Sequence, residues 1–426
     1  MKPLKVLIVF LTCPLFLWAQ ALTLDECQRL AQENYPLINR YCLIEQTTGY
    51  TLENISKGWL PQISATAQAT FQSDVMSFPD AMKNLFAQTG RELKGLSKSQ
   101  YRVGVDVNQM LFDGGIISNQ RKLAKLQGEV QSAQNDVDLY AIRQRVNNLY
   151  FSILLTDERL KVNDDLQTLL ESNLNKLNSM LKNGMAMEGD ISSLKAEQLK
   201  ARQQRTELSS TRKTLCRMLA LMCGVDDINV KKDGQFIKDD ILTNNRPELK
   251  LLDTQLQLAD VQEKLLNSSL LPRMSLFAQG FYGYPGYNTF EDMFSRKWSL
   301  NGMVGARFTW NISQFYTSKG DRAKLQLQRQ LTENAREIFL FNNNLQQVQQ
   351  NEDILKYRQL LEDDANIVSL REEVRKAAES KLNHGIIDTN ALLQEINREN
   401  QAKTELATHE IMMLQQMENL KYTLGN

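Results

Sequence analysis

The sequence has no apolar run after residue 21 that approaches the ~20 residues that a membrane-spanning helix requires. The one long apolar run follows Lys2 and Lys5 and ends before Ala19-Gln20-Ala21, which is typical of a secretory signal peptide. We therefore expect residues 1–21 to direct export of the chain. If the exported chain crosses a membrane, it must do so with β-strands, because backbone polar groups must be paired within lipid.

The chain also lacks an excess of charge of either sign. Its 426 residues include 50 basic and 50 acidic side chains, so the formal net charge is zero. Binding to nucleic acid requires a clustered basic excess, and we therefore expect no nucleic-acid partner.

Cysteine is scarce, and its spacing does not define a disulfide framework. Cys13 lies within the expected signal, where its neighbours fit a lipoprotein anchor poorly. Cys216 and Cys223 are about 10 Å apart along an expected helix, too far to bridge each other. A bridge from either of them to Cys27 or Cys42 is compatible with an oxidising compartment. Burial as small apolar side chains is the favoured interpretation.

Catalytic motifs are absent: there is no phosphate-binding loop, nucleophile elbow, C-x-x-C pair or dinucleotide fingerprint. His409 and Glu410 begin like a zinc-protease H-E-x-x-H motif, but Met413 occupies the place of the second histidine. We expect no enzyme, no metal and no cofactor. Metal export through the 15 methionines is a minor alternative, because methionine is far commoner as a helix-packing residue.

What the sequence does contain is the same helix-to-strand junction twice. The first copy runs from Pro36 to Pro61 and the second from Pro247 to Pro272, a separation of 25 residues in each. The second copy follows the first by 211 residues, about half of the chain, which indicates duplication of a structural unit. Because proline ends a helix and is tolerated at the first residue of a strand, we expect Pro61 and Pro272 to mark helix-to-strand junctions.

Four segments alternate between apolar and polar residues with the period of a β-strand. We expect strands at about 62–72, 101–111, 273–283 and 298–310, which have the length of tilted transmembrane strands and aromatic residues near their ends. A soluble sheet with one wet face would show the same alternation. Two hairpins in an otherwise helical chain favour the membrane interpretation.

Long helices are expected after each hairpin. The segments 115–182 and 313–382 contain no proline, and their apolar residues step by three and four as in a coiled coil. Tight turns are expected at 183–185 and 384–386, each followed by a returning helix. The mature chain then divides into two structural repeats, residues 22–230 and 231–426.

A membrane sheet of four strands has open edges, and unpaired backbone groups in lipid cost several kcal/mol each. Three chains would supply about twelve strands, an even number within the range of closed barrels. We therefore expect a mainly α protein with a β-barrel portion: a long antiparallel coiled-coil tunnel of helices, and four strands per chain that complete a trimeric 12-strand transmembrane barrel.

Several motifs in order carry a family resemblance. They are Leu22–Cys27 with Asn34-Tyr35-Pro36, the segment Gly58–Gln62, the strand-to-helix junction Gln109–Gly115 with Phe112, Asp113, Gly114 and Gly115, and Gly184 followed by Asp190. The chain resembles the TolC-type outer-membrane factors of Gram-negative efflux and secretion systems from residue 22 onward.

The resemblance implies a homotrimer in the outer membrane that extends into the periplasm. It also implies two partners: a periplasmic adaptor (membrane-fusion) protein, and an inner-membrane transporter of the resistance-nodulation-division or ABC type. The protein itself would be a passive exit duct through the lipid bilayer. A type I protein-secretion duct and a periplasmic coiled-coil scaffold without a pore are the alternatives, and the sequence does not identify the cargo.

The resemblance further implies functional residues around the two glycine turns. Asp190 matches the acidic constriction of the family, whereas Ala391 and Gln394 stand where relatives carry acids. A role of Asp190 and Asp388 as helix caps is slightly favoured over an electrostatic constriction, and both remain open. The constriction candidates are Asp190, Asp388, Asn390 and Gln394, and the adaptor-contact candidates are Asn183, Gly184, Met185, His384, Gly385 and Ile386.

Overall fold

The computed structural model describes residues 21–90, 92–232 and 244–426. Residues 1–20 of the expected signal peptide, with Cys13, lie outside the described residues. The chain forms two compact units, each of which draws on both expected repeats. One comprises the described residues of Met1–Tyr41, Gln134–Lys250 and Glu337–Asn426, and the other comprises Cys42–Ala133 and Leu251–Arg336. No helix in the described ranges has the length and apolar character needed to span a bilayer.

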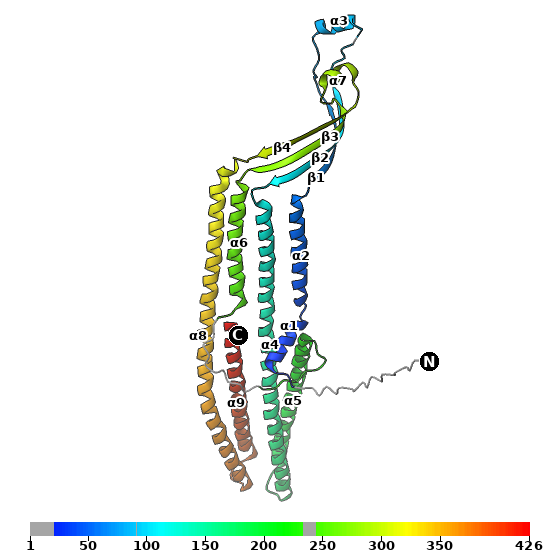
Figure 1. Ribbon diagram of the computed structural model, residues 1–426. Helices are drawn as coiled ribbons and strands as arrows, with labels where there is room; N and C mark the ends of the chain where they lie inside the picture. Colours follow the sequence, from blue (N-terminus) through cyan, green and yellow to red (C-terminus); the bar gives the residue numbers. More distant parts are fainter. Residues whose placement is uncertain (1–20, 91, 233–243) are drawn as a thin grey trace, which may run out of the picture. The chain divides into compact units, whose positions relative to one another are not determined.

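Helices make up most of the described chain, and the four strands occur in two pairs along the sequence (Figure 1). The order of elements is α1 (Leu24–Asn34), α2 (Ile38–Ser56), η1 (Lys57–Trp59), β1 (Gln62–Phe71), α3 (Asp80–Gln88), β2 (Ser99–Phe112), α4 (Ile116–Lys182), α5 (Glu188–Cys223), α6 (Pro247–Ser269), β3 (Arg273–Tyr284), α7 (Thr289–Ser295), β4 (Ser299–Thr309), α8 (Gln314–Asn383) and α9 (Thr389–Leu424). The expected fold class of long antiparallel helices with a four-strand contribution is confirmed for the chain.

The strands form one antiparallel sheet in the order β1-β2-β3-β4. Pairing of β2 with β3 joins the two hairpins, which the sequence pattern did not specify. The register aligns Ala65 with Val105, Val105 with Gly280 and Gly280 with Gly302, so the alternating apolar residues of all four strands share one face. Within this sheet, β1 and β4 are edge strands with one neighbour each.

The two faces of the sheet differ in chemistry. On the apolar face, Ile63, Leu300 and Val304 are 70%, 82% and 81% exposed. On the opposite face, Arg102 Nε donates to Gln68 Oε1 over 2.8 Å, and the Thr66 hydroxyl donates to Asp106 over 3.3 Å. In a water-soluble protein the apolar face of a sheet is covered by other elements. In this sheet the apolar face is exposed.

Both strand-connecting segments contain a short helix that the sequence pattern did not predict. α3 lies between β1 and β2, and α7 lies between β3 and β4. The Asn288 side chain caps α7 by accepting from the Glu291 N–H over 3.3 Å. Two ring pairs join these segments, Phe78 with Phe290 and Phe86 with Phe294.

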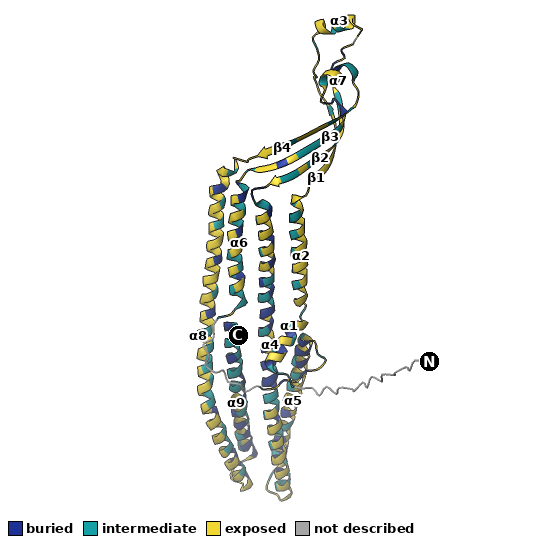
Figure 2. Ribbon diagram, viewed as in Figure 1, coloured by how far each residue is buried: buried dark blue, intermediate teal, exposed yellow. Residues whose placement is uncertain are grey.

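The long helices α4 and α8 begin and end within one residue of the expected bounds. Each is continuous because its segment contains no proline to interrupt the backbone hydrogen bonds. The main apolar core surrounds α4 where α1 and α5 pack against it, with Val146, Ile153 and Leu219 fully buried. By contrast, Figure 2 shows α8 exposed along much of its length. Its exposed apolar side chains include Leu327, Leu331, Phe341, Leu345, Val348 and Leu370.

Candidate functional site

The first hairpin turn is closed by a left-handed glycine. Gly184 has φ +72°, and the N–H of Met185 donates to the carbonyl of Met180 over 2.9 Å. This is the pattern of a helix that ends on an αL residue, where glycine avoids the strain of a side chain. The turn joins α4 to α5 with Asn183 and Met185 exposed.

The second turn repeats this geometry at the end of α8. Gly385 has φ +69°, and the N–H of Ile386 donates to the carbonyl of Lys381 over 2.9 Å. His384 is exposed, and its Nδ1 lies 2.7 Å from the Ser380 carbonyl oxygen. The two turns are thus built alike, as expected from a duplicated unit.

Each turn is followed by one aspartate that caps the returning helix, but at a different position. The Asp190 carboxylate accepts from the Met187 N–H over 3.0 Å, reaching back to the residue before α5. Asp388 is itself the N-cap of α9 and accepts from the Ala391 N–H over 2.8 Å. Both carboxylates therefore act as helix caps while remaining at the tip of the hairpins.

A cavity of about 370 Å³ brings the two turns together. Its lining includes both candidate aspartates and residues from both hairpins: Met180, Gly184, Met187, Asp190, Gly385, Ile387 and Asp388. The structure thus places Asp190 and Asp388 around one space. Asn390 and Gln394 are exposed on α9 and do not line this cavity, and Ile386 is 69% exposed at the turn.

A buried charge cluster that the sequence pattern did not indicate lies further along the same helices. Arg375 of α8 is 8% exposed and Glu399 of α9 is 2% exposed. The Arg375 guanidinium binds Glu399 over 2.5 Å and Glu379 over 2.7 Å. Glu379 also accepts from the Asn173 amide over 3.3 Å, which connects the cluster to α4.

The charged partners of Arg375 and Glu379 offset the effect of burial on the pKa of each. Burial by itself would lower the pKa of Arg375, but the hydrogen bonds and charges of Glu399 and Glu379 raise it. Burial likewise would raise the pKa of Glu379, but hydrogen bonds from Asn173 and Arg375 bring it below its ordinary value. The ion pair of Arg375 with Glu399 therefore joins α8 to α9, and the Asn173 amide links Glu379 to the other hairpin.

The histidine of the incomplete zinc motif has a structural partner. His409 Nδ1 lies 2.6 Å from the carboxylate of Asp364, which joins α9 to α8. Within residues 21–90, 92–232 and 244–426, no three His, Cys, Asp or Glu side chains are grouped so as to hold a metal ion.

The strand-to-helix junction after β2 is held by a buried carboxylate. Asp113 is 4% exposed and accepts from the N–H groups of Gly115 and Ile117, over 2.8 and 2.6 Å. Gly114 has φ +73°, and a Cβ there would lie 2.9 Å from the Leu271 side chain. Asp113 thus caps α4, while Gly114 and Gly115 allow the chain to turn beside the second junction.

The two junction prolines lie directly before strands β1 and β3. Pro61 precedes Gln62, and Pro272 precedes Arg273. Both junctions are tied by side-chain hydrogen bonds to a neighbouring strand end. The Gln109 amide donates to the Trp59 carbonyl over 2.6 Å, and the Trp310 indole donates to the Leu270 carbonyl over 3.0 Å.

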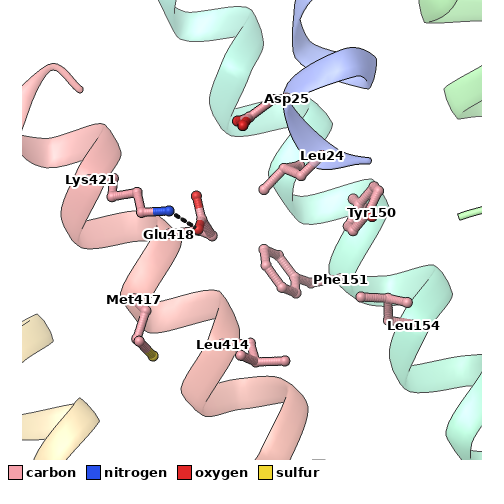
Figure 3. Close-up of a pocket in the computed structure, with 9 residues that line it drawn as sticks. All are labelled: Leu24, Asp25, Tyr150, Phe151, Leu154, Leu414, Met417, Glu418 and Lys421. Carbon is pink, nitrogen blue, oxygen red and sulfur yellow. Dashed lines mark hydrogen bonds and ion pairs between the residues drawn. The ribbon is translucent and has the colours of Figure 1, made fainter. Parts of the chain in front are cut away.

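A second cavity, among α1, α4 and α9, is too small to be a cargo site (Figure 3). Its volume is about 80 Å³, below the several hundred Å³ typical of ligand pockets. Leu24, Phe151 and Leu414 supply apolar walls, and the Lys421 ammonium binds Glu418 over 2.5 Å at one side. We regard this cavity as a packing feature of the helical core.

Known structures with the same fold are outer-membrane proteins. The outer-membrane protein VceC of Vibrio cholerae superposes with a TM-score of 0.70 at 12% identity, covering 95% of this chain and 96% of its own. The CmeC outer-membrane channel of Campylobacter jejuni superposes with a TM-score of 0.67 at 11% identity, covering 94% of this chain and 85% of its own. The open MtrE outer-membrane channel of Neisseria gonorrhoeae superposes with a TM-score of 0.66 at 14% identity, covering 95% of this chain and 89% of its own. No protein-family model and no curated protein matches the chain. The likeness establishes the fold.

Proposed function

We propose that this chain is one subunit of a homotrimeric export channel in the outer membrane of a Gram-negative bacterium. In this proposal, each chain contributes four strands to a twelve-strand barrel, and its helical hairpins form a periplasmic tunnel. The channel is a passive duct. A periplasmic adaptor and an inner-membrane transporter, of the resistance-nodulation-division or ABC type, supply the cargo and the energy.

The observation that carries the proposal is the sheet with an exposed apolar face and two unpaired edges. Leu300 and Val304 project from that face at more than four-fifths exposure, which is favourable in lipid and costly in water. Pairing β1 of one copy with β4 of the next would satisfy the backbone groups at both edges.

The polar face of the same sheet supports a water-filled passage. When the apolar face contacts lipid, the opposite face must line the interior, because successive side chains of a strand point to opposite sides. That face carries Gln68, Arg102 and Asp106, whose side chains hydrogen-bond across the strands.

The exposed apolar residues of α8 support assembly between copies. Leu331, Phe341 and Leu345 lie about one helical turn or more apart and are 64%, 65% and 55% exposed. Such a stripe along a helix in a coiled-coil protein indicates a neighbouring helix, and a second copy of this chain is the partner that we propose.

The turns support docking of an adaptor. Met185 and Ile386 are 61% and 69% exposed at the two tips, while the glycines beside them set the backbone. We assign Asn183, Gly184, Met185, His384, Gly385 and Ile386 to adaptor contact. We assign the constriction to Asp190 and Asp388, with Asn390 and Gln394 on the exposed surface of α9 as secondary candidates.

Extraction and mass measurement test the proposal. We expect the protein to pellet with outer membranes, to require detergent for extraction, and to have the protein mass of three chains in detergent by light scattering. A monomer that is soluble without detergent would contradict the proposal and favour the coiled-coil scaffold.

Site-specific cross-linking tests the adaptor assignment. A photoreactive amino acid at Met185 or Ile386 is expected to capture a periplasmic adaptor in the native host. The matched control is Leu199, which is 57% exposed on α5 away from the turn. Equal capture from all three positions would contradict the assignment. The identity of the captured adaptor and its transporter distinguishes small-molecule efflux from protein secretion.

A further inference from the structure

Two cysteines that are far apart in the sequence meet in the core. Cys27 of α1 has no exposed surface, and Cys223 at the end of α5 is 4% exposed. The Cys223 thiol donates to the carbonyl oxygen of Cys27 over 3.5 Å, so the two residues are in direct contact. The sequence pattern had left open whether either cysteine has a partner.

We propose that Cys27 and Cys223 form a disulfide in the exported protein and that this bond fastens α1 to α5. The proposal is independent of the channel function, because it requires only export to an oxidising compartment.

The surrounding contacts already hold the two segments in register. The Asn34 amide donates to the carbonyls of Leu221 and Met222, over 3.3 and 3.2 Å, at the end of α5. The Leu22 N–H donates to the Asn229 carbonyl over 2.9 Å. These contacts lie on both sides of the cysteine pair, so the bond would form between segments that the fold itself positions.

The other two described cysteines do not compete for this bond. Cys216 precedes Cys223 by about two helical turns on α5, roughly 10 Å along the axis. Cys42 is exposed on α2. Both are expected to remain thiols.

Both thiols are buried once the protein has folded, and contact with Cys27 lowers the pKa of the Cys223 thiol. Contact with the Cys223 thiol, together with burial, raises the pKa of the Cys27 thiol. Only the thiolate attacks a disulfide, and neither sulfur is accessible to an oxidant in the folded chain. Oxidation must therefore occur before α1 is fully packed.

The oxidant that we propose is a protein disulfide of the periplasmic thiol-oxidase class. The thiolate of one cysteine attacks that disulfide and forms a mixed disulfide, releasing one oxidant sulfur as a thiol. The second cysteine, as a thiolate, then displaces the other oxidant sulfur. The chain loses two electrons and two protons, and the oxidant leaves as a dithiol.

The bond would matter because α1 is short. A helix of 11 residues is marginal on its own in water, and α1 depends on packing against α4 and α5. A cross-link between residues 196 apart restricts the opened state of this segment. Reduction is therefore expected to let α1 open locally while the rest of the fold persists.

Trypsin separates the four cysteines that follow the expected signal peptide, which makes peptide mapping decisive. Cys27 lies on a peptide ending at Arg29, Cys42 on Tyr41–Lys57, Cys216 on Thr214–Arg217 and Cys223 on Met218–Lys231. Full-length protein is purified from the native host, alkylated in denaturant without reductant, and digested. We expect a disulfide-linked pair of the Cys27 and Cys223 peptides, and alkylated peptides for Cys42 and Cys216. Full alkylation of Cys27 and Cys223, or a link from Cys27 to another cysteine, would overturn the proposal.

Variants and hydrogen exchange provide a second test. Cys223→Ser is expected to leave Cys27 alkylated, whereas the matched control Cys216→Ser is expected to retain the linked pair. Reduction of the wild-type protein is expected to speed exchange of α1 amides at least about tenfold and to leave exchange of the β2 amides unchanged. Unchanged exchange of α1 after reduction would show that the bond does not fasten the helix. Because peptide mapping uses the wild-type protein, a variant that fails to fold does not affect the first test.

Discussion

The guanidinium of Arg375 and the carboxylate of Glu399 form an ion pair of 2.5 Å between α8 and α9, with the two side chains only 10% and 3% exposed. Arg375 also binds Glu379, which receives a hydrogen bond from Asn173 of α4. Arg375 thus joins α8 to α9 directly, and reaches α4 through Glu379. These charged contacts lie beside an apolar cluster that also joins the hairpins near the tip, with Leu177 of α4, Leu194 of α5 and Leu392 of α9 buried in it.

Removing Arg375 is expected to loosen the contact between the hairpins. Arg375→Met leaves Glu399 with the Lys403 ammonium, 2.7 Å away, as its remaining charged partner. Loss of one partner of a buried ion pair costs up to about 3 kcal/mol when no other partner remains, so we expect a smaller but measurable loss here. The matched control is Arg371→Met, because Arg371 lies one turn away, is 42% exposed, and is 3.7 Å from Glu395. The Glu395 side chain is 17% exposed, but the pair is long and its arginine faces solvent, so we expect it to contribute about 1 kcal/mol or less. Hydrogen exchange of the amides in α9 measures the destabilisation that each variant causes. Equal destabilisation by Arg375→Met and Arg371→Met would contradict the role of Arg375.

Acid is expected to open the same contact through Glu379. Hydrogen bonds from Asn173 and Arg375 hold the pKa of Glu379 below its ordinary value of 4.5, despite burial. A carboxyl whose pKa is depressed by folding stabilises the protein fully above its unfolded-state pKa, and this stabilisation is lost as pH falls through the folded-state pKa. We therefore expect local opening of the contact to increase below about pH 4.5.

The variant Glu379→Gln isolates this effect. Hydrogen exchange near Asn173, corrected for the intrinsic pH dependence of exchange, should be less sensitive to acid in the variant than in the wild-type protein. An identical acid response in both proteins would assign the opening to other carboxylates.

Replacing a turn glycine is expected to strain the tip. Gly184 and Gly385 have φ of +72° and +69°, and a Cβ at either position would meet no atom within 4 Å. The cost of alanine there is therefore backbone strain alone, about 1 kcal/mol for each position. Gly189→Ala is the matched control, because Gly189 is helical and equally unobstructed, and alanine should stabilise it by up to about 1 kcal/mol. Denaturation midpoints that move in the same direction for Gly184→Ala and Gly189→Ala would contradict this prediction.

Replacing Asp190 and Asp388 with asparagine tests the role of their negative charge apart from their role as helix caps. Asn accepts a helix-capping hydrogen bond about as well as Asp does, so Asp190→Asn with Asp388→Asn removes negative charge with little loss of stability. We expect this double variant to lower the cation selectivity of the channel, measured as reversal potential in a salt gradient. Glu207→Gln, an exposed position of α5, is the control for removal of charge elsewhere. An unchanged reversal potential in the double variant would leave the aspartates as caps only.

The sequence pattern predicted the parts of the fold that depend on local periodicity. Alternation predicted an apolar and a polar face for each strand, and the observed register places the apolar residues Ala65, Val105 and Val304 on one face of the sheet. The bounds of α4 and α8 followed from the absence of proline and the presence of glycine at each turn. These signals are carried by neighbouring residues and need no tertiary contact.

The parts that the sequence pattern missed depend on contacts between distant residues. Asn173 and Glu379 are 206 residues apart in the chain, and no spacing rule relates them. The meeting of Cys27 with Cys223 likewise depends on how α1 packs on α5. The helix α7 was missed because it is only 7 residues long and owes its start to a single Asn288 cap.

Conductance of the purified protein in planar lipid bilayers tests the central claim most directly. We predict discrete, equal current steps on insertion of detergent-extracted wild-type protein, with a polarity of ion selectivity that the Asp190 and Asp388 double variant weakens. Protein with the mass of three chains that inserts into bilayers but carries no current at any voltage would contradict the account of this chain as a channel subunit.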